Sequence, residues 1–280
     1  MEVARHEGGS MAALASQIHP VFMLPPVAAS VFGGVLAPEF SLGLAAVFAT
    51  AVFCSVYTAH VTDGYVDYYV RGEDDDHPLT PAGCAVGFAL GTLGFLVAAA
   101  TLFVSVGAVA ALLAVPCWVL AVLHAPVLDT NPVGATVGYP LGVALSVVGG
   151  YYTQAQSFAA TPLAFAGIFL VVLSGVKVID DMQDYEYDRG IGKRTVAVAL
   201  GRRRAHRFAY ALMAAGMVGV FAFVAFAVFP PSASGSVVVF GVVAAVARRA
   251  DAEHATMLLV RGCYLFLAAL LLAVWLHPLA

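Results

Sequence analysis

The sequence predicts an all-α polytopic membrane protein. Hydrophobic residues make up 61% of the 280 positions and charged residues only 11%, whereas a soluble domain carries about a quarter charged residues. The apolar residues gather into separate stretches, most of them near the ~20 residues that a helix needs to cross a bilayer. Membrane lipids are therefore the expected surroundings, and no nucleic-acid partner is expected.

Nine apolar stretches are interpreted as transmembrane helices of a single domain covering residues 1–280. The third and fourth stretches are almost continuous around Val104 and Ser105, so composition alone does not define the division between them. The 27 glycines suit close helix packing in lipid. The predicted spans cover residues 20–37, 40–60, 81–102, 105–125, 134–152, 161–180, 205–229, 235–250 and 256–276.

The basic residues divide cleanly between the two sides that nine spans create. With the N-terminus in the cytoplasm, the outer connections carry no Lys or Arg, as the positive-inside rule requires. Lys177 and Arg261 are the exceptions, because both fall within predicted spans, whereas Arg207, Arg248 and Arg249 lie in the inner end turns of theirs. The N-terminus also lacks the basic region and cleavage site of a signal peptide. The inner segments hold the other basic residues, namely Arg5, Arg71, Arg189, Lys193, Arg194, Arg202, Arg203, Arg204, Arg207, Arg248 and Arg249.

An acidic segment follows the sixth predicted span directly. On a helix that continued past the span, aspartates three and four residues apart would share one face, about 5–6 Å from one another. Carboxylates this close repel one another unless a counter-charge is present. Lys177 lies one turn before the cluster and is expected to pair with it, since an unpaired lysine within a span is costly. The aspartates are Asp180, Asp181, Asp184 and Asp188.

A second acidic segment, earlier in the chain, follows the second span. His60, Asp63 and Asp67 fall at i, i+3 and i+7 and would again share one helix face. The four acids of 73–76 are interpreted instead as a solvent-exposed turn before Pro78. Both segments contain Asp-x-x-x-Asp-Tyr followed by Arg-Gly, and four spans separate them. This echo suggests an internal duplication of helices 1–4 and 5–8.

Topology places both acidic segments on the cytoplasmic side, because each follows a span that runs inward. Two facing groups of carboxylates suit hard divalent cations such as Mg²⁺, and ions held in this way can bind a diphosphate. Mg²⁺ prefers oxygen donors, so His60 is expected to be a base or a polar wall residue, although a ligand role stays open.

At these motifs the sequence resembles the UbiA superfamily of intramembrane prenyltransferases. The family's second motif, Asp-x-x-Asp-x-x-x-Asp after helix six, matches at Asp181, Asp184 and Asp188, and Gly-Lys-Arg-Thr follows at 192–195 with Leu-Gly at 200–201. The resemblance covers essentially the whole chain.

The first motif of the family is altered in this chain. Asp63 and Asp67 match its second and third aspartates, whereas Ala59 and His60 replace its Asn-Asp pair. Three other departures are His77-Pro78-Leu79 at the family's Arg-Pro-Leu turn, His19-Pro20 where relatives often have Arg-Pro, and Asp129 where relatives often have a lysine.

The resemblance implies a ring of nine helices around a central cavity with a cytoplasmic acidic cap. It implies Mg²⁺-dependent transfer of a polyprenyl group from a polyprenyl diphosphate to a lipophilic acceptor, either a quinone-precursor aromatic or an isoprenoid lipid, with release of diphosphate. The 68–80 and 189–204 loops would form a lid that excludes water from the carbocation.

The resemblance also implies roles for individual residues. Asp63 and Asp67 would hold one Mg²⁺, and Asp181, Asp184 and Asp188 another. Asp63, Asp67, Asp184 and Asp188 would be the catalytic set. The diphosphate would contact Lys193, Arg71, Arg194 and Lys177, and the further candidates are His60, Asp180 and Arg261.

Two other interpretations stay open. A catalytically reduced family member would bind an isoprenoid lipid without turning it over, which the altered first motif allows. A secondary transporter also carries charges within spans, but its sites usually lie near the bilayer midplane on broken helices. Here the acids lie at the ends of spans, which disfavours the transporter.

Overall fold

A computed structural model of the chain describes residues 11–276, and within them it contains helices and no strand. Six helices of this part are long and apolar enough to cross a membrane, and three more are shorter and apolar. Together they correspond to the nine predicted spans: α2 (Pro20–Val35), α3 (Leu42–Tyr65), α4 (Pro81–Ser105), α5 (Ala108–Leu123), α6 (Pro132–Ala155), α7 (Ala160–Asp180), α10 (Arg202–Ala225), α11 (Ser234–Ala247) and α12 (Ala252–Leu276).

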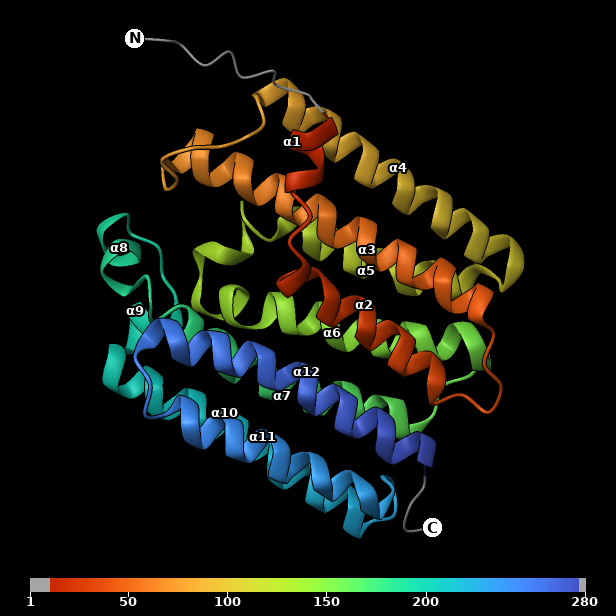
Figure 1. Cartoon of the computed structure of the whole chain (residues 1–280). Coiled ribbons are helices and arrows are strands. Elements are labelled where there is room, and N and C mark those ends of the chain that lie inside the picture. The colour runs from red at the N-terminus through yellow and green to blue at the C-terminus, as the bar shows by residue number, and fades with distance from the viewer. Residues whose placement is uncertain (1–10, 277–280) are drawn as a thin grey trace.

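Shorter elements connect the long helices, and sequence periodicity did not predict any of them. Most of them gather near the end of the bundle where α3 and α7 finish (left in Figure 1). They are α1 (Met11–Ser16), the π-helix η1 (Val66–Arg71), the 3-10 turn η2 (Leu128–Thr130), α8 (Tyr185–Gly190), α9 (Val196–Leu200) and, at the opposite end, the 3-10 turn η3 (Pro231–Ala233).

A glycine separates the third and fourth spans, whose boundary the composition did not define. Helix α4 ends at Ser105 and α5 begins at Ala108. Gly107 between them has φ of +125°, a backbone conformation that side chains with a Cβ rarely adopt. The chain therefore reverses within two residues, and the helices lie antiparallel.

The long helices form a closed ring, which confirms the architecture expected from the resemblance. Each helix in the order α2, α3, α4, α5, α6, α7, α10, α11, α12 packs against the next, and α12 returns to pack against α2. Figure 1 shows them running side by side along one direction. Helix α2 also packs against α6, and α12 against α7, so these contacts cross the ring.

Two adjacent prolines interrupt the backbone hydrogen bonds of α2, the helix at which the ring closes. Pro25 and Pro26 lie inside α2 and have no N–H to donate, so the carbonyls four residues earlier lose their helical partners. Those carbonyls belong to Val21 and Phe22. The hydroxyl of Tyr264 in α12 donates to Val21, and the hydroxyl of Tyr139 in α6 donates to the Phe22 oxygen over 3.0 Å. Side chains from two other helices thus satisfy the backbone that the prolines interrupt.

The packing is that of a multi-pass integral membrane protein. Helix α7 forms much of the core, with Phe165, Val172 and Ile179 all at most 3% exposed. The outer surface is apolar as well: Leu93, Leu112 and other large aliphatic side chains on the outer helices are exposed. An apolar surface of this extent is unstable in water, and it suits the hydrocarbon of a bilayer.

Candidate functional site

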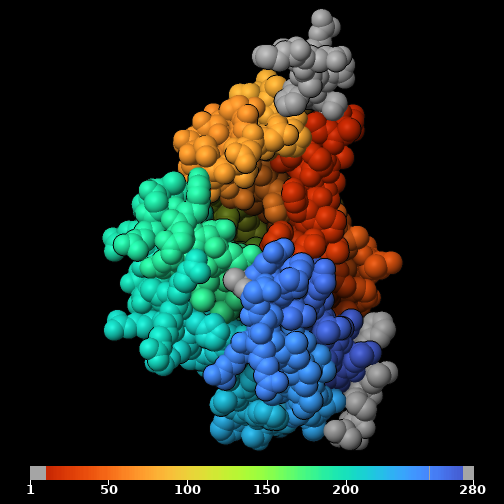
Figure 2. All heavy atoms as spheres, turned by 60° about the vertical axis from the view of Figure 1, so that its left-hand side comes forward, coloured from red at the N-terminus to blue at the C-terminus, as the bar shows by residue number. Residues whose placement is uncertain are grey.

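The two acidic segments meet at the same end of the ring, at the mouth of a cavity of about 620 Å³. Helices α2, α3, α5, α6, α7 and α12 supply its wall. Figure 2 shows the surface hollowed between the end of α3, the α8–α9 region and the start of α12. Apolar side chains such as Val52, Val143 and Leu173 line its deeper part. The cavity therefore has a charged mouth and an apolar interior.

The first acidic segment stays helical and faces the cavity. His60 and Asp63 lie in the last turns of α3, Asp67 lies in the π-helix that follows, and all three line the wall. A π segment is a rare widening of a helix that is frequent at functional sites. Of the acids interpreted as an exposed turn, Asp74 and Asp76 are exposed and also lie at the mouth.

The second acidic segment does not continue as a helix, and that expectation was wrong. Helix α7 ends at Asp180, Asp181 caps it, and a short helix begins again at Tyr185. The chain turns here, so the aspartates do not share one helix face. Asp180 lines the cavity, whereas Asp181, Asp184 and Asp188 are not among the residues of its wall.

Lys177 forms the ion pair expected of it. Its Nζ lies 2.9 Å from Asp180 Oδ2 and 2.7 Å from Asp181 Oδ1. Lys177 and Asp180 both line the cavity. The ammonium therefore holds the end of α7 together and presents a neutralised pair to the cavity.

Asp129 joins the two acidic segments, a role that sequence reasoning missed. Its Oδ2 lies 3.3 Å from Arg71 Nη1 and 2.5 Å from Lys193 Nζ. Arg71 also contacts Asp67 Oδ1 at 3.1 Å and donates to the Ala125 carbonyl. The charge of Asp129 was visible in the sequence, but only the fold places the loop after α5 between the ends of α3 and α7.

Local structure fixes the position of Asp129. Its backbone N–H donates to the carbonyl of His124 over 2.8 Å, and Asn131 then caps α6 by accepting from the N–H of Gly134. On the other side Gly192, with φ of +76°, turns the chain so that Lys193 comes back toward the mouth. A tight turn thus positions each partner of the bridge.

The charges at the mouth change each other's protonation. Burial and the nearby carboxylates of Asp181, Asp184 and Asp129 raise the pKa of Asp188 to about 6, although Lys193 opposes this. Burial also raises the pKa of Asp184. Asp129 is different: burial acts to raise its pKa, but the hydrogen bond and charge of Lys193 outweigh burial and lower it. Asp129 is therefore a carboxylate whose counter-charge outweighs its burial, whereas burial dominates at Asp184 and Asp188.

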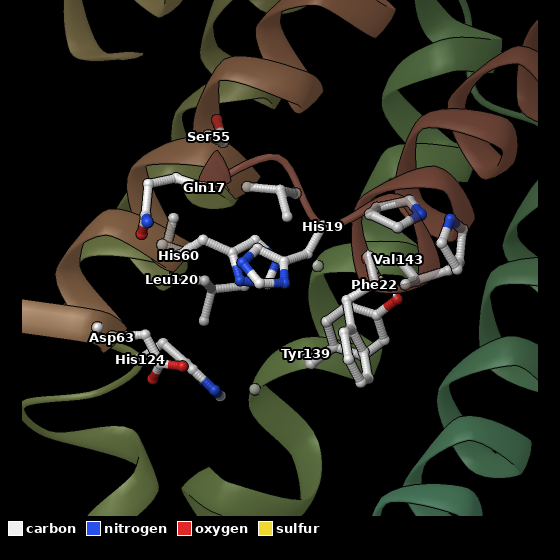
Figure 3. A pocket seen from close by; sticks show the side chains of 18 of the residues that line it. Gln17, His19, Phe22, Ser55, His60, Asp63, Leu120, His124, Tyr139 and Val143 are labelled. Atoms are coloured by element: carbon white, nitrogen blue, oxygen red, sulfur yellow. Dashed lines mark hydrogen bonds between the residues drawn. The ribbon is translucent and has the colours of Figure 1, made fainter. Parts of the chain in front are cut away.

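Three histidines line the cavity near the acids. The rings of His19 and His60 stack with centroids 5.0 Å apart and an interplanar angle of 22°. His124 lies beside Asp63 (Figure 3) and interacts with it electrostatically. All three line the wall. No sequence signal singled out His124, because it lies outside both motifs.

Other candidate residues lie away from the cavity. Arg194 and Arg261 are exposed, and neither belongs to the cavity wall. Lys193 and Arg71 lie behind the mouth, where they pair with carboxylates. The expected cluster of four diphosphate-binding cations is thus divided, with Lys177 alone reaching the wall among residues 11–276.

The donor atoms at the mouth fit Mg²⁺. They are carboxylate oxygens, and Oδ2 of the buried Asp181 has no hydrogen-bond partner among the described residues. Within residues 11–276 no three His, Cys, Asp or Glu side chains lie close enough together to hold a metal alone. Mg²⁺ usually keeps several waters and takes one or two carboxylates together with substrate phosphates. The site therefore suits Mg²⁺ that arrives with a diphosphate, and it is not a closed metal cage.

Comparison with known proteins finds the same fold in solved structures. The apo structure of a UbiA homologue from Aeropyrum pernix K1 has a TM-score of 0.73 at 18% identity, over 90% of this chain and 96% of that one. A digeranylgeranylglyceryl phosphate synthase has 0.69 at 13% identity, over 95% and 99%. A UbiA homologue from Archaeoglobus fulgidus bound to GPP and Mg²⁺ has 0.67 at 15% identity, over 91% and 95%.

No family model matches the chain, and no curated protein does. The fold is that of the UbiA homologues, as the motifs predicted.

Proposed function

We propose that the protein transfers a polyprenyl group from a polyprenyl diphosphate to a lipophilic acceptor with the help of Mg²⁺. One observation carries the proposal: Asp63 and Asp67 from the end of α3 and Asp180 from the end of α7 line the mouth of one cavity, and the rest of its wall is mainly apolar. A substrate with a highly charged head and a hydrocarbon tail matches that division. The positive-inside pattern of the sequence supports a mouth that opens on the cytoplasmic side.

Solved structures with the same fold support this class of substrate. The A. fulgidus homologue has been solved with GPP and Mg²⁺ and also with DMAPP and Mg²⁺. Both ligands are allylic diphosphates. In this chain the diphosphate would lie among the carboxylates, and the prenyl group would follow Val56, Val143 and Val176 into the cavity.

Carboxylates of the two segments would hold the metal. Asp63 and Asp67 would act on one side, and Asp181, Asp184 and Asp188 on the other. When bound, Mg²⁺ neutralises charge on the leaving diphosphate and orients it. Burial raises the pKa of Asp184 and that of Asp188, the latter to about 6, and the cation beside Asp188, Lys193 at 3.9 Å, is also held by Asp129.

The chain's own cations would complete the head-group site. Lys177 already lies on the wall, and Lys193 and Arg71 lie behind it, held by Asp129. An ammonium acts as a point charge and a guanidinium as a fork on phosphate oxygens. For Lys193 or Arg71 to contact the diphosphate, each would have to leave Asp129 or share it.

The reaction is a substitution at the allylic carbon. The bond from C1 to the diphosphate oxygen breaks with its electron pair on the diphosphate, and an acceptor carbon or hydroxyl forms the new bond to C1. The acceptor then loses one proton. Water would capture the allylic cation, so the apolar wall and the loops around η1 and α8 would serve to exclude it.

The experiment is single-turnover transfer of labelled GPP by the purified protein in nanodiscs with a set of lipophilic acceptors. Asp184→Asn should lower the rate at least ~100-fold, because it removes a metal-binding carboxylate. Asp251→Asn is the matched control, since Asp251 pairs with His254 on an exposed surface. Unchanged Mg²⁺-dependent transfer by Asp184→Asn would defeat the assignment of the second segment.

A catalytically reduced lipid-binding protein is the second candidate. It is favoured by the pairing of Arg71, Lys177 and Lys193 with carboxylates and by His60 in the first motif. Tight GPP binding without formation of any prenylated product, across the same acceptors, would establish it in place of the enzyme.

A further inference from the structure

The described wall of the cavity, where the prenyl transfer would take place, carries no Lys or Arg that is free of an ion pair. Among residues 11–276 the only Lys or Arg on the wall is Lys177, and Asp180 and Asp181 both hold it within 2.9 Å. The other charged residues of the wall are the aspartates at the mouth. An acidic acceptor placed there would be desolvated without a counter-charge, which is costly.

Among the described residues, imidazole rings and no further Lys or Arg occupy the place where a cation would be needed. His60 lies three residues before Asp63 on α3, about 4.5 Å along the helix axis, and His19 stacks on it. The reacting end of the acceptor must lie next to C1 of the diphosphate, and therefore near this pair.

The imidazoles have unused hydrogen-bonding atoms. The hydroxyl groups of the wall are engaged: Ser16 donates to Ala13, Ser55 to Ala51, Ser146 to Gly142 and Tyr139 to Phe22. No ring nitrogen of His19, His60 or His124 has a hydrogen-bond partner among the described residues, whereas the backbone groups of His19 and His124 are paired. In Figure 3 the His19 and His60 rings lie together, with Gln17 and Phe22 near them.

From this arrangement we infer that the acceptor is an uncharged lipophile bearing a hydroxyl, and that His19 and His60 determine this specificity by hydrogen-bonding that hydroxyl. A neutral imidazole offers one donor and one acceptor nitrogen, which matches the two capacities of a hydroxyl. A carboxylate or phosphate on the acceptor finds only aspartates and the paired Lys177. The inference rests on the proposed function, since it concerns the second substrate of the same site.

The test measures binding, so it does not depend on turnover. The full-length protein in nanodiscs is loaded with Mg²⁺ and GPP, and the GPP affinity is recorded first. Two matched pairs of probes are then titrated: 1,4-dihydroxynaphthalene against 1,4-dihydroxy-2-naphthoate, and geranylgeranylglycerol against its phosphate. In at least one pair the neutral member is expected to bind at least ten times more tightly than the acid.

Variants at His19 test the role of the imidazole. His19→Arg places a permanent cation on the wall and should shift the ratio of neutral to acid affinity at least tenfold toward the acid. His19→Gln keeps hydrogen bonding without charge and should leave that ratio near the wild-type value. Because His19 is exposed at the start of α2, both variants are expected to fold, and a thermal melt checks this.

The outcomes separate the two claims. If GPP does not bind with Mg²⁺, the proposed function fails. If GPP binds but the acid members bind as tightly as the neutral ones, or no neutral member binds, only the acceptor inference fails. An unchanged ratio in His19→Arg would remove His19 from the specificity site.

Discussion

Asp129 shows how one buried carboxylate can organise a site that it does not enter. It is 6% exposed and bonds Arg71 and Lys193, which come from two segments far apart in the sequence. Breaking a buried ion pair by removing one partner is strongly destabilising, because the other charge is left without compensation. The same carboxylate competes with a diphosphate for the two cations. Asp129 should therefore stabilise the fold and weaken substrate binding.

Asp129→Asn is expected to lower the free energy of unfolding by about 1–3 kcal/mol, since buried charge pairs lose their partner. GPP affinity at saturating Mg²⁺ should rise several-fold, because Arg71 and Lys193 are released. Thermal melts and GPP titration in nanodiscs measure the two effects. Asp75→Asn, at an exposed position, serves as the control. A variant as stable as wild type with unchanged GPP affinity would contradict this role.

His77 gives a prediction for pH dependence. It is 6% exposed, its Nε2 lies 3.5 Å from Cys84 Sγ, and burial lowers its pKa although Asp74 and Asp76 oppose this. The folded protein therefore takes up the proton at lower pH than the unfolded chain. The contribution of His77 to the free energy of unfolding is fully present above the pKa of the unfolded chain, near 6.5. It is lost as the pH falls through the lower pKa of His77 in the folded protein.

His77→Gln should accordingly lose part of the fall in melting temperature that wild type shows between pH 7 and pH 5. His254→Gln is the control, because His254 is exposed and bonded to Asp251 at the surface, so it is not a buried imidazole. Equal pH profiles of wild type and His77→Gln would show that His77 is not a buried neutral imidazole.

At the scale of elements, α2 shows how neighbouring helices stabilise a helix that two prolines interrupt. The carbonyls of Val21 and Phe22 lie near the cavity, and in lipid an unsatisfied backbone oxygen costs several kcal/mol. Tyr264 and Tyr139 provide the missing donors. The sequence shows the prolines and the tyrosines, but their pairing requires knowledge of which helices are neighbours.

Tyr264→Phe should lower stability by about 1–3 kcal/mol, because it leaves the Val21 carbonyl without a donor. Tyr210→Phe is a matched control: its hydroxyl is buried without a hydrogen-bond partner among the described residues, so its removal should be neutral or stabilising. Thermal melts in one detergent compare them. Equal losses from the two variants would show that the hydroxyl of Tyr264 does not stabilise α2.

Sequence patterns predicted the helices well because each span is a long local signal. All nine spans correspond to helices, and the ring follows the expected order. Helix α7 ends at Asp180 as predicted, but the helix expected to continue through the aspartates was wrong, since the spacing of Asp180, Asp184 and Asp188 is equally compatible with a turn that brings counter-charges near. His124 could not be found, because its relation to Asp63 depends on how α5 packs against α3. The internal duplication stays a prediction.

At the scale of the whole molecule, the central claim is that the ends of α3 and α7 hold one diphosphate between them. Asp63 and Asp180 lie more than a hundred residues apart and line the same mouth. If both act on one metal–diphosphate head, their effects on binding must be coupled, since groups sharing a ligand are not additive.

The most direct test is a double-mutant cycle of GPP affinity with Asp63→Asn and Asp180→Asn, each measured with and without Mg²⁺ in nanodiscs. Both single variants should weaken Mg²⁺-dependent binding, and the coupling energy should be about 1 kcal/mol or more with Mg²⁺. Without Mg²⁺ the coupling should largely vanish. Additive effects, or a GPP affinity that does not depend on Mg²⁺, would contradict a shared head-group site.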